Sequence, residues 1–392
     1  MSNETPRTWS PIRLLQLTTF VSTLDRFAMP PMLVVIAHDL GVPLATIVQV
    51  AGIYFLVYGL SQPVWGAVSD RLGRVRTMRL TLLLAGVCTI ASATSGSPLA
   101  LALTRGLAGG FFGAAYPSTL IYVGDTVPAA VRQRDIARLM VGVALGTGLA
   151  SVGAGVVADA LSWRVAFVVT GLGSLALVWL LRSLPEPDDI QRPASVFAPV
   201  LAIARSRVAL AVLLFAFAEG AVLLGGLTLL PTAVEGTGAA VSLAGAVTGV
   251  YGVSVFLGSR LVGHLSGSWH PSRLITLGGA TAVVGCGLLA LTQVPAMAVV
   301  VAVLFGLAWT SMHSSLQTWA TEILPGARAS LVSLFAGSLF VGSALAAVAV
   351  SGWAESGRFS LIYAVTGGLA VPLALAAGWG RRRWRRPEDP RT

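Results

Sequence analysis

The sequence of 392 residues has no lysine, two cysteines and few charged side chains. Charged residues make up 11% of the chain, against roughly 25% in an ordinary soluble domain. Hydrophobic residues make up 55%, and the mean hydropathy is +0.81. A composition so poor in charge excludes a soluble globular domain and predicts a chain that crosses a membrane several times.

Because lysine is missing, arginine alone carries the positive side of the net charge of +10. A strongly basic chain can bind nucleic acid, but these arginines lie in short segments between apolar runs, where membrane topology places them. We therefore expect no nucleic-acid partner. Cys88 and Cys286 both fall inside apolar runs in opposite halves of the chain, so neither a structural disulfide nor a metal site is expected.

Twelve apolar runs have roughly the 20 residues that a helix needs to cross a hydrocarbon core about 30 Å thick. They predict an all-α membrane protein with twelve transmembrane helices, at approximately 14–37, 44–64, 78–95, 98–123, 137–158, 165–184, 209–231, 241–261, 274–291, 296–319, 330–350 and 359–380. Proline and glycine inside some runs suit helices that bend or that approach a neighbour closely. They are Pro30-Pro31 in the first run, Pro117 in the fourth, and Gly146, Gly148, Gly153 and Gly155 in the fifth.

Arginine is distributed unevenly over the loops. With the N-terminus inside the cell, the arginine-rich loops and the C-terminal tail all lie in the cytoplasm, and the external loops keep only Arg164 and Arg358. Positive residues accumulate on the cytoplasmic side of membrane proteins. Both termini are therefore predicted to be cytoplasmic, in a multi-pass protein of the cell's inner (plasma) membrane.

The chain divides into two similar halves. Gly146 aligns with Gly342, and Thr170 with Thr366, in each case 196 residues apart. We predict two pseudo-symmetric six-helix bundles, residues 1–185 and residues 209–392 with a basic tail, joined by a cytoplasmic linker at 186–208. Apolar residues recur at helical spacing in the linker, so part of it either lies on the inner membrane surface or forms a plain solvated connector.

One polar segment, from Gly66 to Arg76, separates the second and third apolar runs. Glycine allows a sharp turn, and an aspartate can accept hydrogen bonds from a helix N-terminus. The segment resembles the signature loop G-x-x-x-D-R-x-G-R-R of the major facilitator superfamily. The residues in register are Gly66, Asp70, Arg71, Gly73 and Arg74. The resemblance implies a twelve-helix transporter with its substrate site between the halves near mid-membrane.

These five residues are expected to form a conformational latch. Asp70 should bond the positive N-terminal end of the eleventh span, near Ser330, and so hold the cytoplasmic side closed in the outward-open state. In the second half of the chain Gly263 takes the position of the aspartate. We therefore expect no equivalent clamp to the fifth span.

The fourth and fifth spans carry partial resemblances to further motifs of this family. The fourth, from Arg105, is similar to R-x-x-q-G-x-g-a-a, which is associated with coupling in proton-driven members, but it has Ala108 in place of the glutamine. The fifth resembles the antiporter motif g-x-x-x-G-P-x-x-G-G at Gly146 and Gly155 only. The chain is most like the drug:proton antiporter branch with twelve spans.

Four ionisable residues stand out deep inside the predicted spans, where each costs roughly 2.5 to 3.5 kcal/mol to insert. They are Asp25, Arg26, Arg105 and Glu219. With a rise of about 1.5 Å per residue, Asp25, Arg105 and Glu219 reach a similar depth, and their spans line the central cavity in the resembled family. We predict that Asp25 and Arg105 interact across the cavity of the N-terminal half. The alternative is a buried ion pair that only fixes helix packing.

Glu219 has no arginine at mid-membrane depth in its own half, so we expect it to be unpaired. Burial disfavours the charged form of such a carboxylate, which can then exchange a proton. Glu219 is therefore the first candidate for proton coupling, with Asp25 as the second. The alternative for Glu219 is a hydrogen-bonded structural acid.

Polar and aromatic side chains form stripes at helical spacing on the second and tenth spans, and both stripes are also compatible with helix packing. Together with two of the buried arginines they make up the predicted substrate cavity. Its residues are Arg26, Arg105, Tyr54, Tyr58, Gln62, Trp309, His313 and Gln317.

These features favour a proton-coupled secondary transporter that exports a lipophilic or amphipathic small molecule by alternating access. We expect it to act as a monomer in the lipid bilayer, driven by the proton gradient without a cofactor. The alternative rests on Asp25 and Arg26, because an Asp-Arg pair in the first span resembles the anion:cation symporters, whose arginine binds a substrate carboxylate. An enzyme is not expected, because HExxH, CxxC, GxSxG and phosphate-loop motifs are missing.

Overall fold

The computed structural model describes residues 10–187 and 197–385, without the side chains of residues 129–134, 137 and 197. Every regular element in these residues is helical, and twelve spans are long and apolar enough to cross a membrane, as predicted. The first six spans are α1 (Pro11–Ala28) with η1 (Pro30–Met32) and α2 (Leu33–Leu40), α3 (Leu44–Leu72), α4 (Arg74–Ala93), α5 (Pro98–Phe112) with α6 (Ala115–Thr126), α7 (Ala129–Ala160), and α8 (Trp163–Leu180) with η2 (Leu181–Ser183).

A short helix, α9 (Phe197–Arg205), precedes the last six spans. It lies within the predicted linker, of which residues 188–196 are outside the described part of the chain. The last six spans are α10 (Arg207–Glu219) with η3 (Gly220–Leu224) and α11 (Gly225–Glu235), α12 (Val241–Leu265), α13 (Pro271–Leu291), α14 (Pro295–Ala308) with η4 (Trp309–His313) and α15 (Ser314–Ile323), η5 (Pro325–Ala327) with α16 (Arg328–Glu355), and α17 (Phe359–Arg383).

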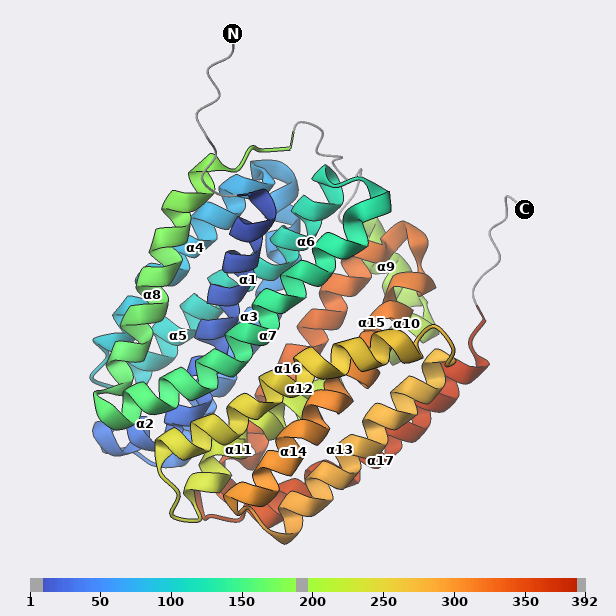
Figure 1. Ribbon diagram of the computed structural model, residues 1–392. Coiled ribbons are helices and arrows are strands. Elements are labelled where there is room, and N and C mark those ends of the chain that lie inside the picture. Colours follow the sequence, from blue (N-terminus) through green and yellow to red (C-terminus); the bar gives the residue numbers. More distant parts are fainter. Residues whose placement is uncertain (1–9, 188–196, 386–392) are drawn as a thin grey trace.

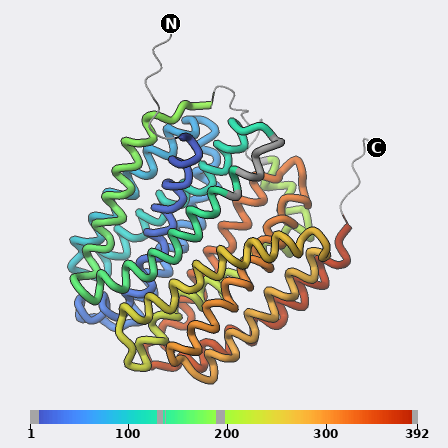
Figure 2. Tube along the Cα trace, in the orientation of Figure 1, coloured from blue at the N-terminus to red at the C-terminus, as the bar shows by residue number. Residues whose placement is uncertain are grey.

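The helix ends define two ends of the molecule. We call the end where α4 begins and α17 finishes the basic end, because arginines such as Arg71, Arg328 and Arg383 lie there. The other, which holds the turns at Gly41 and Gly357, is called the opposite end. Figures 1 and 2 show α1 to α8 together on one side of the molecule and α10 to α17 on the other.

Two kinds of helix irregularity distinguish the spans. Pro30-Pro31 form the short helix η1 and break the first span as predicted, and the fourth span breaks at Gly113, ahead of Pro117. By contrast, α7 runs unbroken through its glycines, so those glycines do not interrupt it. The turns η3 and η4 are π-helical and were not expected from the sequence. Such turns are rare and frequently lie at functional sites.

Glycines let the two sets of spans touch from the middle of the bundle to the opposite end. A Cβ added to Gly252 of α12 would lie 2.6 Å from the backbone N of Gly148 on α7. One added to Gly59 of α3 would lie 2.8 Å from the carbonyl O of Gly337 on α16. The backbones therefore pack directly, as small residues permit between membrane helices. Figure 1 shows α7 and α12 diverging from this contact toward the basic end.

A cavity of about 520 Å³ separates the two sets of spans at the basic end. Its walls come from α3, α6, α9, α15 and α16. Gln62 and Gln317 are among its lining residues nearest the middle of the bundle. The structure is thus open at the basic end and closed by glycine contacts at the opposite end.

Closure of the opposite end should depend on the contact between α7 and α12. In Gly252→Val the new side chain meets backbone atoms of Gly148, so the two helices must separate. Distances between spin labels on Gly96 and Leu291, which are exposed at the opposite end, should lengthen. The measurement needs alanine at the two native cysteines. Gly263→Val is the control on the same helix, because nothing lies near Gly263; equal distributions in both variants would contradict the prediction.

Candidate functional site

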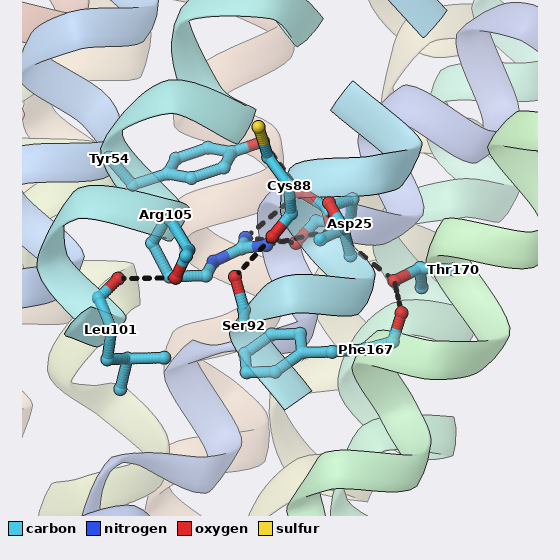
Figure 3. A network of polar contacts seen from close by, with 10 residues as sticks. Asp25, Tyr54, Cys88, Ser92, Leu101, Arg105, Phe167 and Thr170 are labelled. Carbon is cyan, nitrogen blue, oxygen red and sulfur yellow. Dashed lines mark hydrogen bonds and ion pairs between the residues drawn. The ribbon is translucent and has the colours of Figure 1, made fainter. Parts of the chain in front are cut away.

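The predicted contact between Asp25 and Arg105 is present. Arg105 Nη2 lies 2.9 Å from Asp25 Oδ2, and Nη1 donates to Oδ1 at 3.0 Å. Both side chains are 0% exposed. A bidentate pair of this kind has strong directional hydrogen bonds. Figure 3 shows the Arg105 guanidinium directed at Asp25, between the rings of Tyr54 and Phe167. Its central carbon is 4.5 Å from the centroid of each ring.

Three hydroxyl groups complete the surroundings of Asp25. Tyr54 donates to Oδ2 at 3.0 Å, whereas Thr89 and Thr170 donate to Oδ1 at 3.2 and 3.3 Å. The carboxylate therefore accepts five hydrogen bonds, from α3, α4, α5 and α8. Every one of them would be weakened by a proton on Asp25. This geometry resembles a structural ion pair more than a group that gains and loses a proton.

Arg26, the next residue on α1, has a different environment. Its Nη1 donates to the Tyr58 hydroxyl at 3.1 Å and its Nη2 to Thr23 Oγ1 at 3.4 Å. The guanidinium carbon is 5.1 to 5.4 Å from the rings of Phe27, Tyr58 and Phe340. Its Nε is buried without a hydrogen-bond partner. Among the described residues no carboxylate lies within ion-pair distance of Arg26, so it is a cation that the protein leaves without a counter-ion.

The expectation that Glu219 is unpaired is wrong. His313 Nδ1 lies 3.2 Å from Glu219 Oε2. The basic partner is a histidine rather than an arginine, and it lies on the tenth span, far from Glu219 in the chain. Nor does Glu219 join Asp25 and Arg105, because its contact with His313 is separate from their ion pair. Glu219 Oε1 is buried and has no hydrogen-bond partner among the residues that the structure describes.

Both members of this second pair lie at a π-helical turn. Glu219 directly precedes η3, and His313 is the last residue of η4. Trp309 stacks on the His313 ring, with centroids 3.9 Å apart. The Glu219 side chain is 0% exposed and that of His313 is 13% exposed. The imidazole is therefore the member through which water could reach the pair.

The polar and aromatic side chains predicted on the second and tenth spans make different contacts. On α3, Tyr54 bonds Asp25, Tyr58 accepts a hydrogen bond from Arg26, and Gln62 lines the cavity. On the tenth span, Gln317 also lines the cavity, one turn beyond His313. The cavity therefore ends about one helical turn from Arg26's partner Tyr58 and from the Glu219–His313 pair.

The signature loop is shorter than the sequence suggested. Gly66 lies inside α3, and only Gly73 separates α3 from α4. Gly73 has φ +104°, which favours glycine, and the carboxylate of Glu186 occupies the space of a Cβ there. Glu186 accepts hydrogen bonds from the backbone N–H groups of Val75 and Arg76 at 3.1 and 3.2 Å. It caps the N-terminus of α4, a role that the sequence did not reveal.

Asp70 and Arg74 of the loop form an ion pair, and Arg74 Nε also lies 3.0 Å from Asp125 Oδ2. Arg71 is exposed. Asp70 lines the cavity, as do Arg328 and Ser330 in the first turn of α16. The predicted partners of the latch thus face one another across the cavity in a structure that is open at this end.

Several site residues had no signal in the sequence. Thr89, Thr170, Phe167 and Phe340 are ordinary residues of apolar spans, and only tertiary contacts bring them to the charges. Within the described chain, no group of three histidine, cysteine or acidic side chains could hold a metal ion.

Comparison with known proteins gives a clear family match. The sequence model of the Major Facilitator Superfamily matches residues 15–347 and 228–392. An MFS-type efflux pump of Mycolicibacterium smegmatis is 30% identical over 45% of this chain and 41% of its own length. A gallate transporter of Pseudomonas putida is 26% identical over 58% of this chain and 59% of its own. The chain thus spans about half the length of these curated relatives.

Solved structures give the same fold. A D-xylose-proton symporter superposes with a TM-score of 0.79 at 15% sequence identity, over 93% of this chain and 96% of that one. At this identity the likeness concerns the fold alone. The similarity to an efflux pump agrees with the drug:proton antiporter branch that the motifs of the sequence resemble.

The Asp25–Arg105 pair should contribute to stability mainly as a unit. Asp25→Leu or Arg105→Met alone leaves a buried charge unpaired and should lower the free energy of unfolding by roughly 3 to 5 kcal/mol. The double variant removes both charges and should recover a large part of that loss. Thermal unfolding of the four purified proteins in detergent tests this as a double-mutant cycle. If the double variant instead loses the sum of the two single losses in free energy of unfolding, the two side chains do not stabilise the fold as a pair.

Proposed function

The chain belongs to the Major Facilitator Superfamily, and we propose that it is a proton-coupled secondary transporter that moves a small organic anion across the cell's inner membrane by alternating access. It is a multi-pass membrane transport protein rather than an enzyme. Both termini lie in the cytoplasm in this proposal, so the basic end is the cytoplasmic end.

The observation that carries the substrate class is Arg26. A cation inside an apolar bundle is costly unless a negative charge compensates it. Asp25 is bonded to Arg105 and Glu219 to His313, so neither side chain serves Arg26. The carboxylate of a substrate would supply the missing charge. The rings of Tyr58, Phe27 and Phe340 around the guanidinium would favour a substrate with a flat apolar body.

Arg26 thus favours an organic anion over the lipophilic molecule that the sequence alone favours. Export of a lipophilic molecule was placed first, and it keeps the support of the similar efflux pump and of the mostly apolar side chains around the cavity. A lipophilic cation, however, would have to pass an uncompensated guanidinium, and Asp70, the one acidic residue among the described residues that line the cavity, is already paired with Arg74. The relative that transports gallate, an aromatic carboxylate, agrees with the anion candidate.

Proton coupling is assigned to the Glu219–His313 pair. An imidazole and a carboxylate in contact are two groups that can each take up or release a proton. The unpartnered Oε1 of Glu219 can accept that proton without breaking a hydrogen bond. Asp25 is a poorer candidate, because both of its oxygens are already engaged. The π-helical turns beside Glu219 and His313 would let the two helices shift as the proton state changes.

Arg26 should decide anion binding. Arg26→Gln removes a charge-assisted hydrogen bond, so affinity for a carboxylate should fall roughly 10- to 150-fold. Arg26→Lys keeps the positive charge and should therefore keep part of the affinity for a carboxylate. Counterflow of gallate, and separately of tetraphenylphosphonium, into vesicles loaded with each compound measures both classes of substrate. Arg164→Gln at the opposite end is the control. Tetraphenylphosphonium counterflow without gallate counterflow would favour export of lipophilic cations.

Glu219 should be needed for accumulation but not for exchange. In Glu219→Gln the side chain cannot release a proton, so uphill transport driven by a pH gradient should be lost while equilibrium exchange continues. Flux of the substrate and of protons in reconstituted vesicles measures both activities. Glu322→Gln, which changes an acid bonded to Arg381 at the basic end, is the matched control. Full accumulation by Glu219→Gln would transfer the role to Asp25.

A further inference from the structure

Two carboxylates connect the two sets of spans at the opposite end. Glu355, the last residue of α16, accepts a hydrogen bond from the backbone N–H of Ala45, in the first turn of α3, at 2.9 Å. Asp159, near the end of α7, accepts one from the Ser242 hydroxyl, in the first turn of α12, at 2.6 Å. In each case one helix belongs to the first six spans and the other to the last six.

The two contacts have the same geometry. An acid at the C-terminal end of one helix reaches the N-terminal turn of its antiparallel partner. The first turn of a helix has unsatisfied N–H groups and a partial positive charge, so a carboxylate there is favourable. Gln49 and Ser351 add a third polar contact between α3 and α16, at 3.2 Å. These bonds can form only while the opposite end is closed.

The basic end has the same geometry with fewer acids. Asp70 lies in the last turn of α3, facing the start of α16 across the cavity. In the second of these helix pairs, α7 and α12, it is α12 that finishes at the basic end; it contains no acidic residue, and Gly263 occupies the position equivalent to Asp70. Counted over the described residues of these two helix pairs, the opposite end therefore has two acids at helix C-terminal ends and the basic end has one.

We infer that Glu355 and Asp159 are latches that hold the opposite end closed, and that their excess over the single latch Asp70 biases the empty transporter toward the state that is open at the basic end. This rests on the alternating-access part of the proposed function. Each latch contributes a small free energy, but the balance between two states of similar stability shifts with small free energies. The state of the present structure is the one that the two latches favour.

A nearby acid determines how the second latch is tested. Glu235, the last residue of α11, lies within electrostatic reach of Asp159. Two carboxylates repel when both are charged. Because these two come from different sets of spans, their repulsion acts between the sets and opposes closure of the opposite end. Replacing Asp159 would remove a hydrogen bond and a repulsion together. Ser242 is therefore the residue to change in this latch.

The experiment measures the distance between spin labels on Gly96 and Leu291 in the substrate-free full-length protein, with alanine at Cys88 and Cys286. Glu355→Ala and Ser242→Ala should each raise the ratio of open to closed opposite ends about two- to fivefold, and the double variant should multiply the two effects. Asp39→Ala is the control, because Asp39 pairs at the same end with Arg164 of the same set of spans. It should leave the ratio unchanged.

Two further variants complete the test. Asp70→Ala removes the single latch of the basic end and should lower the same ratio. Gly252→Val provides the reference distance of an open opposite end. Unchanged ratios in Glu355→Ala and Ser242→Ala, in a protein whose Gly252→Val form shows the longer distance, would overturn the latches and leave alternating access intact. A single distance in every variant, Gly252→Val included, would overturn alternating access and the latches with it.

Discussion

The cost of placing charge inside an apolar bundle governs this structure. Twelve spans bury a small number of ionisable side chains, and each of them must find hydrogen bonds or an opposite charge within a few ångströms. Asp25 and Arg105 meet this requirement completely, with five donors on the carboxylate and two aromatic rings around the guanidinium. The pair ties four of the first six spans to α1. It thereby provides a rigid frame against which the less satisfied charges are placed.

Glu219 and Arg26 are functional candidates because their requirements are met only in part. Glu219 shares one oxygen with His313 and leaves the other free, and Arg26 has a hydroxyl and rings but no carboxylate. A fully bonded group resists a change in its charge state or its contacts, whereas a partly bonded one can accept a proton or a ligand. The structural pair differs from the proposed coupling and binding groups in how many hydrogen bonds and opposite charges surround it, and not in burial alone.

In the proposed alternating-access cycle, the two states differ at the seam between the two sets of spans. Gly148 and Gly252 let backbones touch at mid-bundle, and Gly155 and Gly245 do so nearer the opposite end, so that end closes through van der Waals contact without a bulky side chain to reposition. Polar contacts at helix ends add small, directional contributions to this closure. Because each polar contact is small, the two states of the proposed cycle can remain close in free energy, as alternating access requires.

Hydropathy and spacing by themselves determined the class of protein, the twelve spans and the signature loop, because the membrane requires long apolar helices and places arginine in loops. Matched depth along the helices was enough to predict that Asp25 and Arg105 meet. Sequence could not reveal that His313 pairs with Glu219, since 94 residues separate them and only the packing of the seventh and tenth spans brings them together. The π-helical turns, the extension of α3 through Gly66 and the caps made by Glu186 and Glu355 were likewise decided by tertiary contacts. Glu186 and Glu355, for example, accept hydrogen bonds from backbone N–H groups of distant segments, and the local pattern of residues carries no information about those segments.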